Sequence, residues 1–251
     1  MIEKIIMRNF LILIMCLVFS GLESALAAVP QSSSTRPFIW ITQGERADLL
    51  NKIANEAWAA DYLAELKSRV DSDVNQHVNN PGLTINQIPA FGADPNQSSE
   101  STAANHKKIL SPAADAALLY FITQQEKYAQ YAADILEAYF DHLAPLTPET
   151  TTICGSDFYD PRTTYNHIAI AYDFIYNFLR DPSTTVYDNP SGTRIPFDNA
   201  KAQQALSNIV GDALQEWRAD RYGRTVSNHP ILTAPGALFP ILCIEDAAER
   251  E

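Results

Sequence analysis

The chain has 251 residues and a formal net charge of −12 at pH 7, with 46% hydrophobic and 19% charged residues. This apolar content is typical of a globular protein and excludes an intrinsically disordered chain. The strong negative charge argues against nucleic acid as a partner, although a local basic cleft can still attract an anionic ligand.

The first 27 residues have the features of a secretory signal peptide. Lys4 and Arg8 precede an apolar run over residues 10–19, and Ala25-Leu-Ala27 forms an A-x-A cleavage site. The apolar run is shorter than the roughly 20 residues that a bilayer span needs. We therefore expect cleavage after Ala27 and a periplasmic or secreted protein that has no membrane contact once the signal is removed.

Apolar spacing indicates helices over most of the remaining chain. A leader over 28–43, with a short extended segment at 38–41, precedes two consecutive helices, or one broken helix, across 44–78. Turn signals with few apolar residues predict a long irregular region over 79–110. Irregular regions of this length are usually functional or disordered.

Ser111 and Pro112 are typical of the N-cap and first residue of a helix, which we expect to run to Phe121. A connection at 123–126 with the spacing of a capping box leads to the next helix, so the two helices should pack antiparallel. Polar loops at 143–162 and 181–196 separate the helices that follow. These are an interior helix over 163–179, an amphipathic helix at 198–219 and a small-residue helix that begins near Pro230 and contains Pro240.

Helix hairpins in series, with no strand alternation beyond short runs, predict an all-α fold. Such hairpins build bundles, solenoids or curved α/α toroids, and the absence of a fixed-period repeat disfavours a solenoid. The sequence ends at 247–251 within a helical pattern that has no capping or stop residue. We therefore expect residues 44–251 to form one helical domain that is incomplete at its C-terminus.

Asn228 and His229 are the first candidates for chemistry. They stand at the start of the small-residue helix, shortly after Arg218, Arg221 and Arg224. Guanidinium groups bind carboxylates, and a helix N-terminus attracts negative charge. The alternative is that Ser227 or Asn228 serves only as a helix cap.

A second group of polar side chains, Arg162, Tyr165, Asn166 and His167, stands at the entrance of the interior helix and is suited to sugar binding. His167 alone could equally be a core histidine. His106 falls in the irregular region, where it would either contact the substrate from a lid or belong to a solvated turn.

No pair of histidines has the spacing of a metal site, such as His-x-x-x-His, so we expect neither a metal ion nor another cofactor. Cys154 and Cys243 remain after signal cleavage. They could pair in an oxidising compartment or stay as free buried thiols, and the sequence leaves both possibilities open.

Three segments together resemble the N-terminal helical domain of polysaccharide lyases of the heparinase II/III and alginate lyase kind. They are Arg36–Leu50, the hairpin Ala113–Ala133, and Ser227–Pro230 with the small-residue helix after it. The first two patterns are shared by many α/α-barrel proteins, whereas the Asn-His segment is more specific. The resemblance extends over residues 36–245 and implies an incomplete (α/α) toroid of antiparallel helix hairpins.

The same resemblance implies β-elimination at a uronic acid of an anionic polysaccharide such as alginate, ulvan or a glycosaminoglycan. Asn228 would bind the C5 carboxylate, and His229 would act as the base or help to neutralise the charge. Arg221, Arg224, His106 and the polar group at the helix entrance would bind the substrate. The essential tyrosine of these lyases and their β-rich C-terminal domain would lie beyond residue 251.

Two other functions are compatible with the sequence. A glycoside hydrolase on an α/α barrel needs two acids that flank the scissile bond, for which Asp160, Asp173 and Glu216 are candidates. A non-catalytic domain that binds polyanionic glycans is the other alternative, because the expected tyrosine is absent from the sequence given.

Overall fold

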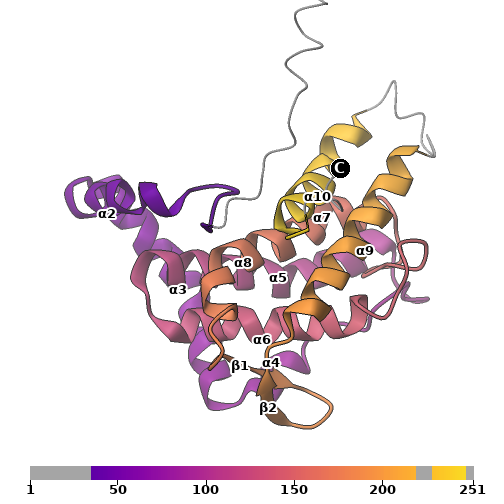
Figure 1. Cartoon of the computed structure of the whole chain (residues 1–251), viewed down its shortest axis with the longest axis horizontal. Helices are drawn as coiled ribbons and strands as arrows, with labels where there is room; N and C mark the ends of the chain where they lie inside the picture. The colour runs from indigo at the N-terminus through magenta and orange to yellow at the C-terminus, as the bar shows by residue number, and fades with distance from the viewer. Residues whose placement is uncertain (1–34, 219–227, 247–251) are drawn as a thin grey trace, which may run out of the picture. The chain divides into compact units, whose positions relative to one another are not determined.

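The computed structural model describes residues 35–218 and 228–246, which fall within one compact unit (Figure 1). The predicted signal peptide at 1–27 lies outside these residues, as do Arg221 and Arg224. The described part is mostly helical. Its elements in chain order are the 3-10 helix η2 (Gln43–Glu45), α2 (Arg46–Asn55), α3 (Ala57–Asn79), α4 (Pro81–Ile85), α5 (Ser99–Thr123), α6 (Glu126–Leu143), α7 (Tyr159–Thr163), α8 (Tyr165–Leu179), β1 (Thr185–Asp188), β2 (Thr193–Pro196), α9 (Asn199–Arg218) and α10 (His229–Cys243).

The first two helices confirm the prediction for residues 44–78. Helix α3 buries one stripe at helical spacing, formed by Leu66, Val70, Val74 and His77. The extended segment expected at 38–41 forms no strand. Its backbone N–H groups at 38 and 39 instead donate to a buried carboxylate of α8.

The irregular region predicted over 79–110 is wrong in its second half, because helix α5 already begins there. It begins at Ser99, where the side chain of Ser98 accepts a hydrogen bond from the backbone of Ser101 at 3.2 Å, and it continues through Pro112 to Thr123. Proline removes one backbone hydrogen bond from a helix interior. The helix persists because its first turns already bury Thr102, His106 and other side chains against the core.

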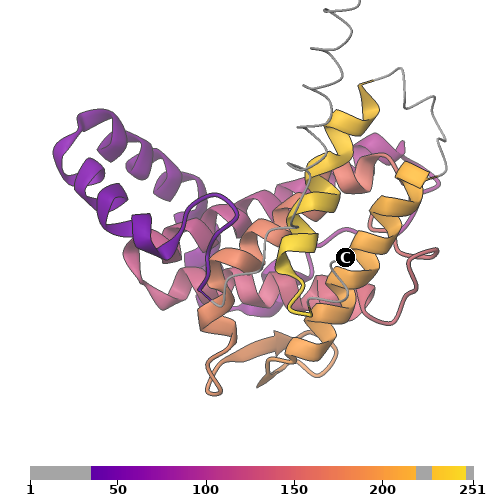
Figure 2. The same ribbon diagram turned by 45° about the horizontal axis from the view of Figure 1, so that its top comes forward.

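Helices α5, α6 and α8 form the centre of the core. Gln124, with a φ of 58°, ends α5 in the left-handed conformation, and α6 returns antiparallel beside it as predicted. No side-chain cap hydrogen bond forms at the start of α6, so the predicted capping box is wrong. Helix α8 is the predicted interior helix and packs on both α5 and α6. Figures 1 and 2 show α10 alongside α9 on the outside of this centre.

A β-hairpin occupies part of the loop expected at 181–196. Strands β1 and β2 pair antiparallel, with Val186 opposite Ile195. Asp134 of α6 is fully buried and accepts hydrogen bonds from Tyr187 N at 2.9 Å and from Arg194 Nη2 at 2.9 Å. The carboxylate of Asp134 thereby attaches the hairpin to the helices, and the fold is mostly helical with a small hairpin instead of all-α.

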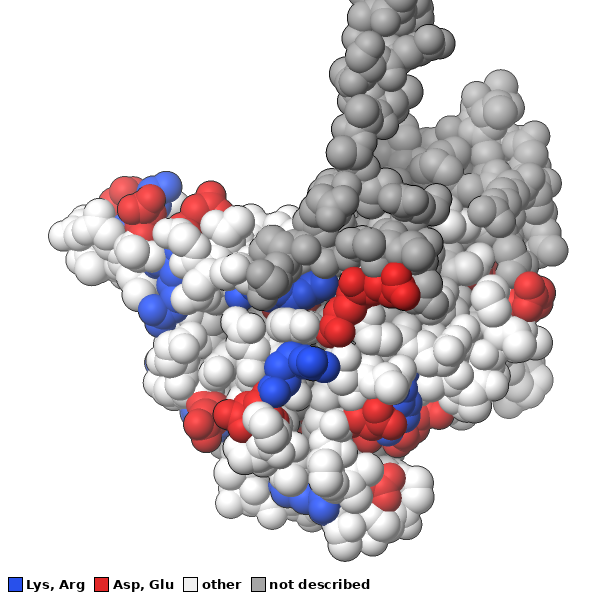
Figure 3. Space-filling model, viewed as in Figure 1, with Lys and Arg blue, Asp and Glu red and all other residues white. Residues whose placement is uncertain are grey.

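The sequence left undecided whether Cys154 and Cys243 form a disulfide, and in the structure both are buried free thiols. Sγ of Cys243 donates to the carbonyl oxygen of Ala169 at 3.4 Å. Within the described ranges, no helix is both long enough and apolar enough to cross a bilayer. On the face drawn in Figure 3, acidic and basic side chains are interspersed without a continuous patch of either sign.

Candidate functional site

The Asn-His segment lies at the N-terminus of α10. Asn228 is the N-cap residue, with φ −84° and ψ 0°, and its exposed side chain makes no cap hydrogen bond. Asn228 takes part in the helical hydrogen bonding through its backbone carbonyl, which accepts from Leu232 N at 3.2 Å. The carboxamide is therefore not used as a cap. His229 begins the helix, and its side chain lies outside the described part, as do the predicted Arg221 and Arg224.

A glycine contact fixes the middle of α10 against α7. A Cβ on Gly236 would lie 2.0 Å from the carbonyl oxygen of Pro161, so only glycine allows the two helices to approach this closely. Asn228 precedes Gly236 by eight positions, which places it about 12 Å along the helix axis. The contact with α7 therefore positions the helix that carries Asn228 at its start.

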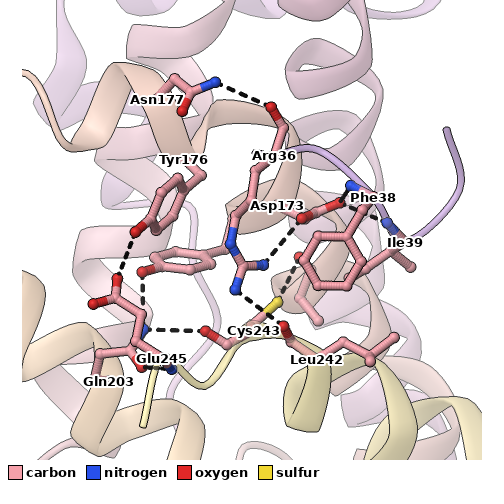
Figure 4. Close-up of polar contacts among 12 residues, drawn as sticks. Arg36, Phe38, Ile39, Asp173, Tyr176, Asn177, Gln203, Leu242, Cys243 and Glu245 are labelled. Atoms are coloured by element: carbon pink, nitrogen blue, oxygen red, sulfur yellow. Dashed lines mark hydrogen bonds and ion pairs between the residues drawn. The ribbon is translucent and has the colours of Figure 1, made fainter. Parts of the chain in front are cut away.

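A buried ion pair fixes the other end of α10 (Figure 4). Arg36 donates from Nη1 to Asp173 Oδ1 and from Nη2 to the carbonyl oxygen of Leu242, both at 3.0 Å. The guanidinium also lies 4.8 Å from the ring centroids of Phe38 and Tyr176. Arg36 and Asp173 are only 2% and 1% exposed. Helix α10 is thus held by α7 at its middle and by the leader and α8 at its C-terminal end.

Arg162 of α7 presents a positive charge next to the start of α8. Its side chain is exposed, and the guanidinium lies 5.4 Å from the ring centroid of Phe158 and 6.0 Å from that of Tyr159. Stacking on the two aromatic rings restricts the orientation of the guanidinium. A pre-oriented exposed arginine is suited to binding a carboxylate or a sulfate.

Asn166 orients the imidazole of His167. Oδ1 of Asn166 accepts from the backbone N–H of His167 at 3.0 Å and lies 2.9 Å from the ring Nδ1. Because the backbone N–H can only donate, Oδ1 is fixed as the acceptor for both hydrogen bonds, so Nδ1 of the neutral ring carries the proton. Burial, together with the positive charge of Lys107, lowers the pKa of His167 to about 4. His167 is therefore neutral at pH 7.

Two of the predicted substrate-binding residues are buried in the core. Tyr165 is fully buried and donates to Asp212 Oδ2 at 2.7 Å, which links α8 to α9. Its pKa is raised far above the usual range by burial. His106 is also fully buried, at 2.9 Å from the hydroxyl of Tyr139, and burial lowers the pKa of His106 to about 4. Neither side chain reaches a surface that a substrate could contact in this structure.

The positive charge of Lys107 acts on His167, a relation that the irregular region predicted over 79–110 did not reveal. The signal was present in Ser98 and in the polar residues of the first turn after it, which are typical of a helix start. With α5 starting at Ser99, Lys107 is an exposed residue on a helix that packs against α8.

Asp160 and Asp173, two of the acids considered for glycoside hydrolysis, have other roles. Asp160 is 1% exposed and accepts hydrogen bonds from the backbone N–H groups of Ile153 and Cys154, each at 2.9 Å. Asp173 is held in the ion pair with Arg36. Neither acid is exposed to a substrate, and the side chain of Glu216 lies outside the described part. Among the described residues, no group of three His, Cys, Asp or Glu could hold a metal ion.

Comparison with known proteins finds a relative that matches most of the chain. No protein-family model matches the chain. The chain is homologous to a protein of Formosa agariphila named endo-acting ulvan lyase, with 47% identity over 223 residues. The alignment covers 87% of the chain and 27% of the relative, so the chain spans about a quarter of the relative's length.

Proposed function

We propose that this chain is the helical part of an exported polysaccharide lyase that cleaves a uronate-containing anionic polysaccharide by β-elimination. The observation that carries the proposal is the 47% identity to a protein named for ulvan lyase activity, which extends over 87% of the chain. Ulvan is accordingly the first substrate to test. Alginate and glycosaminoglycans are the alternatives within the same reaction class.

The proposed reaction removes the C5 proton of a uronate and expels the C4 glycosidic oxygen. A double bond forms between C4 and C5, and the leaving oxygen receives a proton. The C5 proton becomes acidic enough only when the charge of the carboxylate is neutralised. We assign this role to Asn228, whose carboxamide is exposed and makes no cap hydrogen bond at the start of α10. Arg221 and Arg224 would bind the polyanion beside it.

His229 is the proposed base, and the structure adds His167 as a second candidate. A base has to be unprotonated and within hydrogen-bond reach of the proton. His167 is neutral at pH 7, and Asn166 fixes the orientation of its ring. Arg162, Asn166 and His167 are the proposed substrate contacts of α7 and α8. Tyr165 and His106 would act only through the packing of the helices that carry them.

The proposed architecture is an (α/α) toroid to which further segments of a longer polypeptide contribute. The helix hairpins of the described part agree with such a toroid, and the relative is several times longer than the chain. A tyrosine that protonates the leaving oxygen, and a β-rich domain, would come from the additional segments. Export by the signal peptide would bring the enzyme to extracellular polysaccharide.

The test is incubation of the purified full-length protein with ulvan, alginate or glycosaminoglycans while ultraviolet absorbance is recorded. An unsaturated uronate product should appear with ulvan. It should be lost in Asn228→Ala and His229→Ala and retained in Lys67→Ala, a change on α3 remote in sequence from the proposed residues. Comparing His167→Ala with His229→Ala in the same assay decides which histidine is required.

Other outcomes identify the alternatives. New reducing ends without an unsaturated product would favour a glycoside hydrolase. Binding of a polyanion that survives Asn228→Ala and His229→Ala, without turnover of any substrate, would favour a non-catalytic glycan-binding domain. Absence of product with every uronate polymer would refute the lyase.

A further inference from the structure

A polar cavity of about 360 Å³ lies among α3, α4, α5 and α6. Ligand sites in proteins commonly have volumes of roughly 300–1,000 Å³. None of the cavity's residues belongs to α7, α8 or α10, which carry the proposed catalytic and substrate contacts. The lining residues are Asp73, Gln76, Thr84, Gln87, Pro89, Asn105, Lys108, Ile109 and Tyr131.

The polar groups of the cavity include donors and acceptors in similar number. The side-chain amides of Gln76 and Gln87 each offer both functions, and the carboxylate of Asp73 accepts. Sugar hydroxyls also donate and accept, so such a lining matches a polyhydroxylated ligand. A purely apolar ligand would leave these groups without partners.

Lys108 supplies a positive charge to this cavity. Nζ of Lys108 donates to Asn105 Oδ1 at 3.0 Å, and Nδ2 of Asn105 donates to Gln97 Oε1 at 3.1 Å. The chain of hydrogen bonds restrains a side chain that would otherwise be freely mobile. Its ammonium group can then pair with one anionic group of a ligand.

Tyr131 is buried at 2% exposure and lines the same cavity. Its hydroxyl makes no hydrogen bond with any described residue, whereas the hydroxyl of Tyr128 on the same helix donates to Asp71 at 2.6 Å. Burial and the negative charge of Asp73 raise the pKa of Tyr131, so the phenol stays protonated and can donate. The hydroxyl is not among the buried polar atoms that lack a partner, so solvent reaches it and it can donate to a ligand or to water in the cavity.

We propose that this cavity binds one acidic sugar unit of a polysaccharide, with Lys108 pairing with its carboxylate or sulfate and Tyr131 donating to one of its oxygens. The inference rests on the proposed function for the class of ligand. It adds a saccharide site on α3 to α6 that is separate from the residues assigned to the reaction. The carboxylate of Asp73 accepts from the sugar hydroxyls.

The test measures equilibrium binding of oligosaccharides to the full-length protein by calorimetry. His229→Ala is the background for every measurement, so that the proposed reaction does not consume the probe. Ulvan oligosaccharides are titrated first. Alginate oligosaccharides carry carboxylates and no sulfate, so they show whether a carboxylate is sufficient for binding. Neutral cello-oligosaccharides test whether binding needs a charge on the sugar.

Lys108→Ala is expected to weaken binding of the acidic probe about tenfold, as for loss of a hydrogen bond to a charged group. Lys67→Ala, which changes the net charge equally but lines no part of the cavity, should leave the affinity unchanged. Tyr131→Phe should weaken binding several-fold, with Tyr128→Phe as its matched control. Lys108 is exposed and Tyr131→Phe keeps the buried ring, so both variants should retain the circular dichroism of the parent.

Equal affinities of Lys108→Ala and Lys67→Ala, or binding of neutral probes as tight as that of acidic probes, would overturn the assignment. Binding that needs Lys108 in a protein that cleaves nothing would support the cavity site and refute the lyase. Cleavage of ulvan by a protein in which Lys108→Ala changes neither KM nor affinity would support the lyase and refute the cavity site.

Discussion

Replacing Arg36 by methionine tests how the end of α10 is held. Methionine keeps much of the apolar side-chain volume between the rings of Phe38 and Tyr176 but removes the charge. Asp173 would keep its hydrogen bonds from the backbone N–H groups of residues 38 and 39, each at 2.9 Å, and would lose its counter-ion. The carbonyl of Leu242 would lose the donor that Arg36 provides.

The expected loss of stability follows from the burial of the pair. Arg36 and Asp173 are 2% and 1% exposed, and removal of one partner from a buried ion pair costs about 3–5 kcal/mol of unfolding free energy. Replacing both charges often restores stability. The double variant Arg36→Met/Asp173→Asn keeps an acceptor for the two backbone N–H groups, and we expect it to be more stable than Arg36→Met alone.

The loss should depend on pH in a defined direction. Burial already raises the pKa of Asp173 above its usual range, and removal of the guanidinium raises it further. An acid whose pKa is higher in the folded state than in the unfolded state stabilises the fold when protonated, and this contribution is lost as the pH rises. The difference between wild type and Arg36→Met should therefore be smaller at pH 5 than at pH 7.

Urea denaturation followed by circular dichroism at both pH values measures these free energies. Two results would refute the reasoning. One is a loss below about 1 kcal/mol at pH 7, which is the size expected of an exposed ion pair. The other is a double variant that is no more stable than Arg36→Met, because the cost would then not arise from an unpaired buried charge.

Two further predictions concern the surroundings of the proposed site. Gly236→Ala should lower the unfolding free energy by about 1–3 kcal/mol, the usual cost of overpacking, since its Cβ would lie 2.0 Å from the oxygen of Pro161. Gly44→Ala is the control in a thermal unfolding experiment, because its Cβ would meet nothing closer than 3.8 Å. His167 should titrate by NMR with a pKa of about 4, and Lys107→Ala should raise this pKa by removing a positive charge. A titration near the ordinary value of 6.5 would contradict the half-buried position of the ring.

The helices with continuous apolar faces could be predicted from local sequence. Helices α6, α8 and α9 begin and end within a few residues of the expected positions. Their side chains repeat at helical spacing, and this repeat decides both the helix and its buried face. The same information placed Asn228 at the start of the last helix, because Pro230 and the small residues after it are local signals.

Helix α5 and the hairpin show where local signals were insufficient or were given the wrong weight. Ser111 and Pro112 are a sound helix start in isolation, but burial of Thr102 and His106 against the core stabilises turns that precede the proline. The hairpin contains the strand-favouring residues Val186 and Tyr187, and Pro190-Ser-Gly192 between the strands is a turn signal. Its position depends on Asp134, which is 53 residues away from Tyr187 in the sequence.

The sequence by itself determined the helical class, the main helix hairpins and the position of the Asn-His segment, because each depends on residues within one or two helical turns. Tertiary structure decided which polar residues remain accessible. Tyr165 is buried and donates to Asp212 of α9, and His106 lies against Tyr139 of α6, whereas Arg162 stays exposed. Helical spacing gives the face on which a side chain lies. Whether another helix covers that face depends on contacts between distant segments, which a single sequence does not contain.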